Sequence, residues 1–406
     1  MNIALLSYEY PPETGFGGIG TYTYYQARGL AKLGYRVHVL AGATETTGLR
    51  RSDHDGVIVH RYRHEGPWMR LFSRLGSLKL WWTKNRLENA LSMHHGLMAL
   101  MRTEPLDVVE MPECGAEGAW LTARLEIPTV VKFHSPARLI MPFYEVSRTD
   151  HRLCSMVEQR AIVEARSLTS CSRFLAEAVT RDLNVRRPIH VIPNGIDLEL
   201  FDKLPYSDAR RKFDLPTDRP IILFSGRMER RKGIHLCAEI ARTILERHEV
   251  AMVFAGQDLF GHMVHEIMPA VKRARLKGSF HFLGKLDLSD VRACLMAADI
   301  FLIPSLWENC PYSCLEAMAA GCAIVSSNQG GMPELIRHGE NGMLAANGTA
   351  AHYVDALEQL IEDRGLRERL GAAARRTVED SYTDQEIARR SVEWYRTILQ
   401  GDRRRA

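Results

Sequence analysis

The sequence has little net charge, no long hydrophobic run and no paired cysteines. Its formal net charge is only +4 over 406 residues, so we expect no nucleic-acid partner, and any attraction to anions must come from local clusters. No apolar run approaches the roughly 20 residues that span a bilayer. The 8 cysteines show neither CxxC pairs nor metal-ligand spacing, which indicates reduced thiols, no metal site and a cytoplasmic protein.

The N-terminus lacks the features of a signal peptide. Residues 1–12, MNIALLSYEYPP, enter an apolar strand directly, without a charged region or a small-residue cleavage site. What is present is the composition of a folded globular protein, with 46% hydrophobic and 25% charged residues. A chain of this length suits two domains of about 200 residues each.

Short apolar runs alternate with helix-length amphipathic segments along nearly the whole chain. This alternation predicts an α/β fold with doubly wound parallel sheets covered by helices. The pattern restarts after residue 196, so we place an N-terminal domain at residues 1–193 and a C-terminal domain at residues 197–382. The expected strands are NIALLSY, YRVHVLAG, LDVVEM, PTVVKFH, SLTSCS and PIHVIPNG, then PIILFSG, VAMVFAG, SFHFLG, DIFLIPS and CAIVSS.

A last helix is expected at about residues 384–400, capped by Thr383 or Asp384. Trp394 and Tyr395 are available for packing. The helix either packs back on the N-terminal domain or is an ordinary surface helix.

Gly15, Gly17 and Gly20 match the G-x-G-x-x-G dinucleotide fingerprint, but their surroundings do not. In that fingerprint the first glycine follows the strand directly, and an acid about 20 residues later binds the ribose. Here residues 9–14, with two prolines, intervene, and the second strand lacks the acid. We therefore reject a nicotinamide site. We interpret Gly17 and Gly18 as a loop that lets a large ligand approach, next to a helix N-terminus that can bind an anion; the alternative is a simple turn.

The sharpest signal is residues 304–321, PSLWENCPYSCLEAMAAG. A loop carries Glu308, and a short helix begins near Pro311, contains Glu316 and stops at Gly321. In a parallel sheet this loop lies at the carboxyl ends of the strands, where ligands bind. Glu316 is suited to accept two ribose hydroxyls, and Glu308 would lie nearer the reacting sugar. The alternative is that both are solvated acids near a helix start.

A second cluster, residues 226–233, GRMERRKG, follows the strand PIILFSG and precedes a helix. Arg227 and Lys232 flank this turn, where cations and helix amides can neutralise a diphosphate. A nucleoside diphosphate gains negative charge as its bond to the sugar breaks, so such cations favour the transition state. We interpret Arg230 and Arg231 as a solvated charge run.

Together these residues resemble the retaining glycosyltransferase family 4 (glycosyl transferases group 1) of the GT-B fold. The likeness covers nearly the whole chain. It implies two Rossmann-like domains facing across a cleft, the N-terminal one on the acceptor side and the C-terminal one binding a nucleotide sugar. The residues that carry it are the Gly17–Gly18 loop, Phe133-His134, Pro193–Asp197, the Gly226–Lys232 block, Glu308 and Glu316.

The resemblance also implies roles in the C-terminal domain. Arg227 and Lys232 would clamp the diphosphate, Glu316 would accept from the ribose, and Glu308 would be the catalytic acid at the donor sugar. Many relatives read E-x-F-G after the first acid, whereas here Asn309-Cys310-Pro311 follows. Because proline donates no amide, sugar hydroxyls there would be served by Asn309 or by the amides of Cys310 and Tyr312.

In the N-terminal domain, Gly17 and Gly18 would cover the phosphates, and His134 would be the catalytic-site histidine that reaches the donor sugar. Without the resemblance, His134 reads as a satisfied histidine at a strand end. Asp53-His54-Asp55 matches the D-x-D of metal-dependent transferases but leads into Gly56, so we interpret it as a turn.

The implied reaction moves a hexosyl unit from a UDP- or GDP-sugar to a glycan, a lipid-linked or a small-molecule acceptor, with retention and without metal or cofactor. The leaving phosphate would take the acceptor proton, so no carboxylate pair at glycosidase spacing is needed. The alternatives are a GT-B-like sugar-nucleotide epimerase and a non-catalytic nucleotide-binding module. The complete set of Arg227, Lys232, Glu308 and Glu316 argues against the last.

Residues 67–86, PWMRLFSRLGSLKLWWTKNR, mix tryptophan and bulky apolar residues with spaced cations. This composition suits a helical insertion that packs on the N-terminal domain, which we favour. It also suits peripheral contact with anionic lipid at the inner face of the membrane.

Overall fold

The computed structural model describes residues 1–15, 17–45, 48–123, 125–202, 206–346 and 348–403. The chain divides into two compact units. The N-terminal unit comprises Met1–Gly195 and the segment from Asp384 onward, and the C-terminal unit comprises Ile196–Thr383. The division falls inside the segment Pro193–Asp197, where proline and glycine interrupt the pattern of strands and helices.

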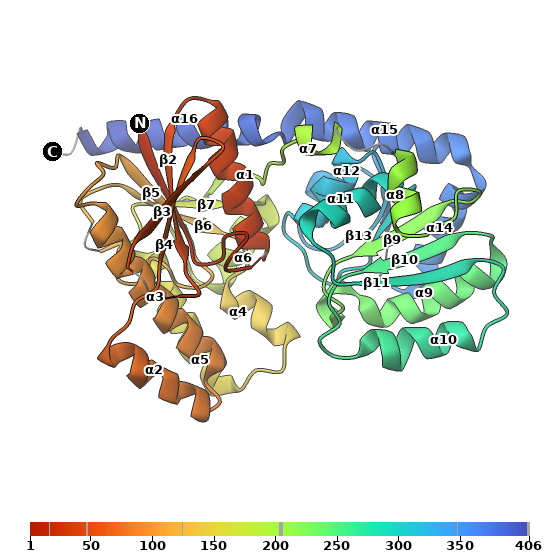
Figure 1. Ribbon diagram of the computed structural model, residues 1–406, viewed down its shortest axis with the longest axis horizontal. Helices are drawn as coiled ribbons and strands as arrows, with labels where there is room; N and C mark the ends of the chain where they lie inside the picture. Colours follow the sequence, from red (N-terminus) through yellow and green to blue (C-terminus); the bar gives the residue numbers. More distant parts are fainter. Residues whose placement is uncertain (16, 46–47, 124, 203–205, 347, 404–406) are drawn as a thin grey trace. The chain divides into compact units, whose positions relative to one another are not determined.

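The N-terminal unit contains an eight-stranded sheet in the order β3-β4-β2-β1-β5-β6-β7-β8 (Figure 1). All neighbours pair in parallel except β3 and β4, which form an antiparallel hairpin at one edge. The strands are β1 (Asn2–Ser7), β2 (Arg36–Gly42), β3 (Arg50–His54), β4 (Val57–Tyr62), β5 (Val108–Pro112), β6 (Thr129–Phe133), β7 (Ser167–Ser170) and β8 (His190–Val191).

The β3–β4 hairpin corrects part of the sequence interpretation. Asp53 and His54 lie on β3 and pair with Ile58 and Val57. The turn itself is Asp55-Gly56, and both residues have positive φ angles, 52° and 80°. The first two residues of the D-x-D triplet therefore belong to a strand and the third to the turn. The reason is that the edge of β4 is open to pairing with the residues that precede the turn.

The last helix belongs to the N-terminal unit and packs along α1, as Figure 1 shows. Lys32 forms an ion pair with Asp384 (3.1 Å), and the Tyr395 hydroxyl donates to the buried Glu110 carboxylate (2.7 Å). The helices of this unit are α1 (Gly18–Lys32), α2 (Pro67–Ser77), α3 (Trp81–Leu100), α4 (Ala137–Ile140), η1 (Met141–Phe143), α5 (Arg148–Glu164), α6 (Arg173–Asp182) and α16 (Asp384–Arg403).

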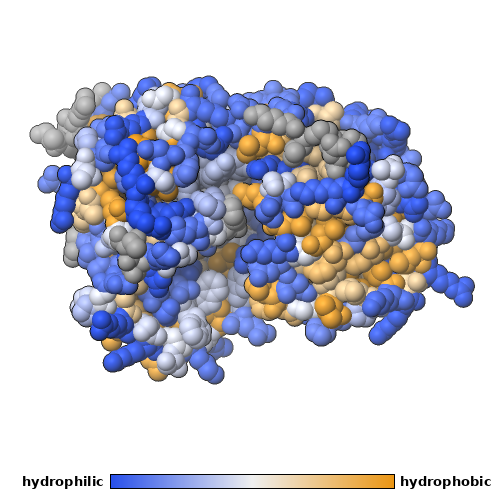
Figure 2. All heavy atoms as spheres, in the orientation of Figure 1, coloured by the Kyte–Doolittle hydropathy of each residue, from blue (hydrophilic) through white to orange (hydrophobic). Residues whose placement is uncertain are grey.

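The C-terminal unit contains a six-stranded, fully parallel sheet in the order β11-β10-β9-β12-β13-β14. Figure 2 shows hydrophobic residues on the face of this unit around β10 and β11, where Phe282 of the edge strand is exposed. The strands are β9 (Ile221–Ser225), β10 (Ala251–Ala255), β11 (Ser279–Gly284), β12 (Ile300–Ile303), β13 (Ala323–Ser327) and β14 (Met343–Ala345).

The helices of the C-terminal unit cover both faces of this sheet. The strands β10 and β13 are buried at every position, as expected for a parallel sheet covered on both sides. The helices are α7 (Glu199–Asp202), α8 (Tyr206–Lys212), η2 (Arg230–Lys232), α9 (Ile234–Arg247), η3 (Met263–Ile267), α10 (Met268–Lys272), α11 (Leu288–Ala297), α12 (Tyr312–Ala319), α13 (Met332–Leu335), α14 (Ala350–Glu362) and α15 (Arg364–Ser381).

Both sheets have the strand order of a Rossmann fold, which confirms the predicted class. Counted from its first strand, the C-terminal sheet reads 3-2-1-4-5-6, and the N-terminal sheet follows the same order with added edge strands. The strand order reverses between β1 and β5 in one unit and between β9 and β12 in the other. Ligands bind at such reversal points, beyond the carboxyl ends of the strands.

Candidate active site

At the reversal point of the C-terminal unit, the loop after β9 and the loop after β12 are held together by backbone contacts. The amide of Leu306 donates to the carbonyl of Arg231 (2.8 Å). Gly233 has a φ of 77°, and a Cβ atom there would lie 1.9 Å from the Pro304 oxygen. Only glycine permits this close approach, so the two loops form one assembly.

Charged side chains on these two loops alternate in sign. Lys232 Nζ contacts Glu308 Oε1 (2.5 Å), and Arg231 Nη1 lies 3.7 Å from Glu308 Oε2. Arg231 also pairs with Glu229 (2.8 Å), and Glu229 pairs with Arg227 (3.4 Å). The order is Arg227, Glu229, Arg231, Glu308 and Lys232, which we call the charge chain. It brings together the predicted Arg227, Lys232 and Glu308.

The structure corrects the interpretation of Arg231 as part of a solvated charge run. Arg231 is only 6% exposed, whereas Arg230 is exposed as predicted. Besides its two carboxylate partners, Arg231 donates to the Trp307 carbonyl (3.2 Å). The short helix η2 directs the two neighbouring side chains differently, and charge composition alone contains no such information.

Glu308 is a buried ion rather than a solvated acid. It is 7% exposed. Burial alone would raise the pKa of Glu308, but Lys232 and Arg231 lower it below its ordinary value. Gly331 donates its amide to the Glu308 carbonyl (2.8 Å), which fixes the backbone of this residue. The side chain is therefore held in place and charged.

The residues after Glu308 lead directly into α12. Pro311 is the N-cap of this helix, and its carbonyl accepts from the amide of Cys314 (3.1 Å). Asn309, Cys310 and Tyr312 are buried. The predicted helix start is thus confirmed, and Pro311 occupies a position where the missing amide costs no helical hydrogen bond.

Glu316 lies inside α12 and is buried, so the alternative of a solvated acid is wrong for it too. The helix ends at Ala319, and Gly321 follows with a φ of 78°, as the sequence predicts.

In the N-terminal unit, Gly17 and Gly18 lie where the β1 loop enters α1. Gly17 is the N-cap, and a Cβ atom there would lie 1.9 Å from the Glu9 Oε2 atom. Gly18 has open space around it. The carboxylate of Glu9 therefore lies against the start of α1, where a helix favours an anion.

His134 follows β6 and is buried with its ring 4.7 Å from the ring of Tyr22 on α1. Its backbone amide donates to both oxygens of Glu113 (2.9 Å each), and the Ser135 amide donates to Oε1 (2.6 Å). Burial, with a smaller effect of Lys132, lowers the pKa of His134 well below its ordinary value. The imidazole is therefore neutral at pH 7.

Two buried glutamates, Glu113 and Glu158, accept from backbone amides of the loop at residues 134–137. Glu158 accepts from Arg86 Nε (3.0 Å) and from the Ala137 amide (2.7 Å). Burial raises the pKa of Glu113 to about 8, with a further effect of Glu158, and burial also raises the pKa of Glu117 to about 8. Glu113 and Glu158 thus fix the backbone at His134, Ser135 and Ala137.

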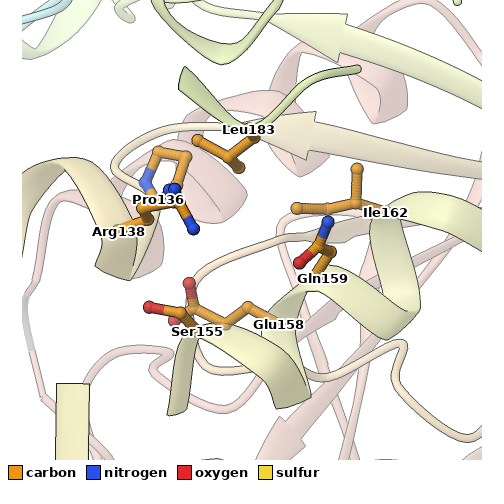
Figure 3. Close-up of a pocket in the computed structure, with 7 residues that line it drawn as sticks. All are labelled: Pro136, Arg138, Ser155, Glu158, Gln159, Ile162 and Leu183. Atoms are coloured by element: carbon orange, nitrogen blue, oxygen red, sulfur yellow. The ribbon is translucent and has the colours of Figure 1, made fainter. Parts of the chain in front are cut away.

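The Glu158 side chain also lines a small pocket (Figure 3). The other lining residues come from α5, from Pro136 and the α4 helix that follows it, and from the end of α6. The pocket has room for about one water molecule, which is too little for a sugar. Its lining is Pro136, Arg138, Ser155, Glu158, Gln159, Ile162 and Leu183.

Sequence reasoning missed Glu229 and Arg231 in one unit, and Arg86, Glu113 and Glu158 in the other. Glu229 and Arg231 stood inside a block already singled out, and their alternation in sign was the available signal. Arg86 and Glu158 are 72 residues apart, and only the packing of α3 against α5 brings them together.

Within the residues that the structure describes, no three His, Cys, Asp or Glu side chains are grouped as a metal site requires. In the same part of the chain, no helix is both long and apolar enough to cross a membrane.

Comparison with solved structures identifies the fold. Sucrose-phosphate synthase from Thermosynechococcus elongatus superposes with a TM-score of 0.78 at 21% identity, covering 98% of this chain and 99% of that chain. Anabaena HepE, solved with UDP and glucose, superposes with a TM-score of 0.70 at 19% identity, covering 97% and 98%. The likeness to these structures and the Rossmann-like sheet within each unit define a protein of the GT-B class.

Comparison of sequences identifies the family. Residues 206–377 match the glycosyl transferases group 1, and residues 16–200 match Glycosyltransferase Family 4. Alpha-maltose-1-phosphate synthase of Mycobacterium tuberculosis is 30% identical over 290 residues, 67% of this chain and 74% of the relative. Glycogen synthase of the same organism is 27% identical over 433 residues, 99% of this chain and 96% of the relative. The chain belongs to glycosyltransferase family 4 and is a hexosyltransferase, which disfavours the epimerase and the non-catalytic module.

Proposed function

We propose that this protein transfers a hexosyl unit from a UDP- or GDP-sugar to a glycan, lipid-linked or small-molecule acceptor, with retention of configuration and without a metal or cofactor. The charge chain at the reversal point of the C-terminal unit carries this proposal. It places two partly accessible cations, Arg227 and Lys232, at a helix start, which is where a diphosphate binds. The complex of Anabaena HepE with UDP and glucose supports a nucleotide donor of this kind.

In the proposed complex, Arg227 and Lys232 clamp the diphosphate and Glu316 accepts from the ribose. Glu308 contacts the donor sugar as a charged acceptor, consistent with its lowered pKa beside Lys232 and Arg231. Asn309 and the amides of Cys310 and Tyr312 serve the sugar hydroxyls that Pro311 cannot reach.

For the N-terminal unit, we propose acceptor binding. His134 acts as a neutral hydrogen-bond partner of the transferred sugar, consistent with the lowering of its pKa by burial. Gly17 and Gly18 cover the donor phosphates, and the open space at Gly18 is compatible with a close approach.

In the proposed step, the bond between the anomeric carbon and the phosphate oxygen breaks, and the acceptor oxygen bonds to the same face of that carbon. The acceptor proton passes to the leaving phosphate, so the products are the glycoside and the protonated nucleoside diphosphate. The chain's own contribution is electrostatic, since fixed cations stabilise the charge that develops on the leaving group.

Ligand-induced stabilisation tests the proposal. UDP, GDP and ADP are added separately to the protein, and a nucleotide present at about 100 times its Kd is expected to add about 2.7 kcal/mol of stability. Nucleotide sugars that pass this screen are then assayed for hydrolysis and transfer. Protection by none of the three nucleotides would refute a nucleotide-sugar transferase.

The double variant Arg227→Ala/Lys232→Ala tests the roles of the two cations. Removing one preorganised donor costs about 2.7–4 kcal/mol in comparable sites, so the double variant is expected to lose nucleotide protection and transfer. Undiminished glycoside formation would contradict the proposed clamp.

We also propose peripheral contact of this cytoplasmic enzyme with an anionic lipid surface through α2 and the start of α3. Packing on the N-terminal unit, the favoured interpretation, accounts for one side of α2, since the ring centroids of Phe72 and Trp120 are 6.3 Å apart in a stacked arrangement. The other side of this segment is exposed, and Figure 2 shows hydrophilic and hydrophobic residues mixed around α2. Its apolar members, between 47% and 67% exposed, are Trp68, Leu71, Leu78 and Trp81. Residues 67–86 contain no acid, and the cations Arg70, Arg74 and Lys79 among them are exposed, which suits an anionic surface.

Vesicles of phosphatidylglycerol test this contact. Trp82 packs against Tyr144 (6.0 Å) and under Arg86 (5.1 Å), so it is a poor target. The variant Trp68→Ser/Trp81→Ser is expected to weaken vesicle binding and leave thermal stability nearly unchanged. Leu259→Ser/Phe260→Ser, at two equally exposed positions of the other unit, is the control. Equal binding by both variants would contradict the proposal.

A further inference from the structure

Two neighbouring arginines on η2 differ in their surroundings. Arg230 is exposed, whereas Arg231 is buried and contacts Glu229, Glu308 and the Trp307 carbonyl. A buried guanidinium is retained only where several acceptors satisfy it. A general attraction of anions to a cationic surface does not explain why Arg231 is buried among these acceptors.

We propose that Arg231 is a positioning residue that keeps the Glu308 carboxylate charged and in place when Lys232 turns to the diphosphate of the donor. The inference rests on the proposed function and deepens it. Of the three cations in the charge chain, Arg227 and Lys232 then bind the substrate, and Arg231 holds the acids of the protein.

The first step of the argument concerns Lys232, which has two possible partners in the proposed reaction. In this structure its Nζ atom contacts Glu308 Oε1. A lysine ammonium on a flexible stem can exchange this carboxylate for a phosphate. Glu308 would then be a buried carboxylate that had lost its nearest cation, which is a costly state unless another cation remains.

The second step concerns the anchoring of Arg231. Its guanidinium reaches Glu308 Oε2, the oxygen that Lys232 does not contact. It also donates to Trp307 O (3.2 Å), and its own carbonyl accepts from the Leu306 amide (2.8 Å). Side chain and backbone of Arg231 are thus both tied to the loop that carries Glu308. A planar guanidinium with five donors can serve these acceptors at once, and an ammonium cannot.

The third step concerns Glu229, which balances the cations. It is buried and pairs with Arg231 (2.8 Å) and with Arg227 (3.4 Å). The Arg227 side chain is 54% exposed. When Arg227 turns to the diphosphate, Glu229 keeps its short pair with Arg231. Arg231 therefore holds both acids of the charge chain while both accessible cations are engaged.

The groups that face Glu308 come from three elements. Lys232 and Arg231 lie on η2, the Ser305 hydroxyl lies on its own loop, and the Cys314 thiol lies on α12. Burial raises the pKa of Cys314 well above its ordinary value, so this thiol is uncharged. With Lys232 engaged by phosphate, Arg231 is the cation that these contacts leave beside Glu308.

The variant Arg231→Gln removes the charge and retains a donor for the Trp307 carbonyl. We expect kcat to fall about 10–100-fold, the usual effect of losing an orienting partner. We also expect the acidic limb of the kcat–pH profile to move to higher pH, because Glu308 has lost a cation. Nucleotide protection in the thermal assay is expected to remain, since Arg227 and Lys232 are intact.

Two further variants complete the test. Arg231→Lys retains the charge and is expected to restore the acidic limb, but kcat stays low because lysine cannot serve all the acceptors. Arg230→Gln, on the same turn, is the matched control and is expected to behave as the unchanged protein. If Arg231→Gln does not fold, the Arg231→Lys variant tests the proposal instead. An unchanged kcat in Arg231→Lys would overturn the proposal.

The remaining outcomes are distinguishable. An unchanged kcat and pH profile in a folded Arg231→Gln variant would overturn the positioning role. Loss of nucleotide protection in that variant would also overturn it, because Arg231 would then bind the diphosphate itself. Failure of the unchanged protein to bind or use any nucleotide sugar would refute the proposed function instead.

Discussion

Glu113 and Glu308 occupy equivalent places in the two units but have opposite electrostatics. Each follows the fourth strand of a Rossmann-like sheet, β5 or β12, beside the first strand, β1 or β9. Burial raises the pKa of Glu113 to about 8, whereas Lys232 and Arg231 hold the pKa of the equally buried Glu308 below its ordinary value. Both residues are preceded by an apolar run and followed closely by a cysteine, so the sequence makes them look alike.

The neighbouring loops explain the difference. In the C-terminal unit, the loop after β9 supplies Arg227, Arg231 and Lys232 to Glu308 and its partner Glu229. In the N-terminal unit, the neighbours of Glu113 are backbone amides and another carboxylate, Glu158. The same position in the fold thus holds a glutamate with a raised pKa that binds backbone amides in one unit, Glu113, and a charged glutamate in the other, Glu308. The comparison predicts different responses to mutation and pH.

The largest expected effect is on stability in the N-terminal unit. Arg86→Ala leaves Glu158 buried without its cation, which costs about 3–5 kcal/mol. Lys232→Ala leaves Glu308 paired with Arg231, so we expect a loss on the order of 1 kcal/mol. Urea unfolding followed by tryptophan fluorescence measures both, since Trp307 lies in the C-terminal unit and the other 5 of the 6 tryptophans lie in the N-terminal unit. Equal losses of unfolding free energy in the two variants would contradict the proposed difference between the two units.

The second effect is on activity. Glu308→Gln removes a charge that we propose acts on the donor sugar, so kcat is expected to fall about 10²–10³-fold. Glu113→Gln acts through the His134 backbone and is expected to lower kcat about 10–100-fold. Steady-state kinetics on the first active nucleotide sugar decide the order. A larger fall in kcat for Glu113→Gln than for Glu308→Gln would contradict the proposed role of Glu308 at the donor sugar.

The third effect is the pH dependence of stability. Because burial raises the pKa values of Glu113 and Glu117 from 4.5 to about 8, the folded protein binds more protons than the unfolded chain between these values. Stability therefore decreases as pH rises through this window, by at most about 1.4 kcal/mol per pH unit for each carboxyl. Glu113→Gln is expected to flatten this slope.

Glu308→Gln is the control for the pH experiment. Since the pKa of Glu308 is lowered by Lys232 and Arg231, its contribution is complete above its ordinary value of 4.5 and is lost as pH falls further. Unfolding free energies from pH 5 to 8.5 should therefore show an unchanged slope for Glu308→Gln. A flattened slope in this variant would contradict the assignment of opposite shifts.

The smallest effect concerns the first loop of the N-terminal unit. Gly18 is exposed at the start of α1 with open space around it, so Gly18→Ala is expected to add about 0.4–1 kcal/mol of stability. Gly17→Ala would place a Cβ atom 1.9 Å from Glu9 Oε2 and is expected to destabilise instead. Thermal unfolding of the two variants compares them directly, and a stabilising Gly17→Ala would show that Glu9 moves away freely.

Much of the fold was predictable because it depends on local pattern. The alternation of apolar runs and amphipathic segments predicted most of the parallel strands, and Pro311 and Gly321 predicted the limits of α12. Three strands, β3, β4 and β14, are missing from the expected ones. β3 is polar and β14 has only three residues, Met343–Ala345, whereas β4 is an apolar run that the same alternation should have indicated. The hairpin partner, not the sequence of β3, stabilises it.

The site was predictable only where its residues are near one another in the sequence. Arg227, Lys232 and Glu308 stand in blocks with a recognisable chemistry, and the structure joins them in one charge chain. Arg231 was misread as solvated, because the direction of a side chain on a 3-10 turn follows from its packing. Glu113 and Glu158 could not be found at all, since the amides of His134 and Ser135 that bind Glu113, and the Arg86 side chain that binds Glu158, are distant in sequence.

The amino-acid sequence by itself determined the class of the fold, the family and the identity of the charged blocks, because periodicity and short motifs are local properties of the chain. Only the tertiary structure decided which of these charges are buried, which are paired and which carboxyl is neutral. The reason is that a pKa depends on burial and on the nearest opposite charge, and both are set by loops that the folded sheets bring together.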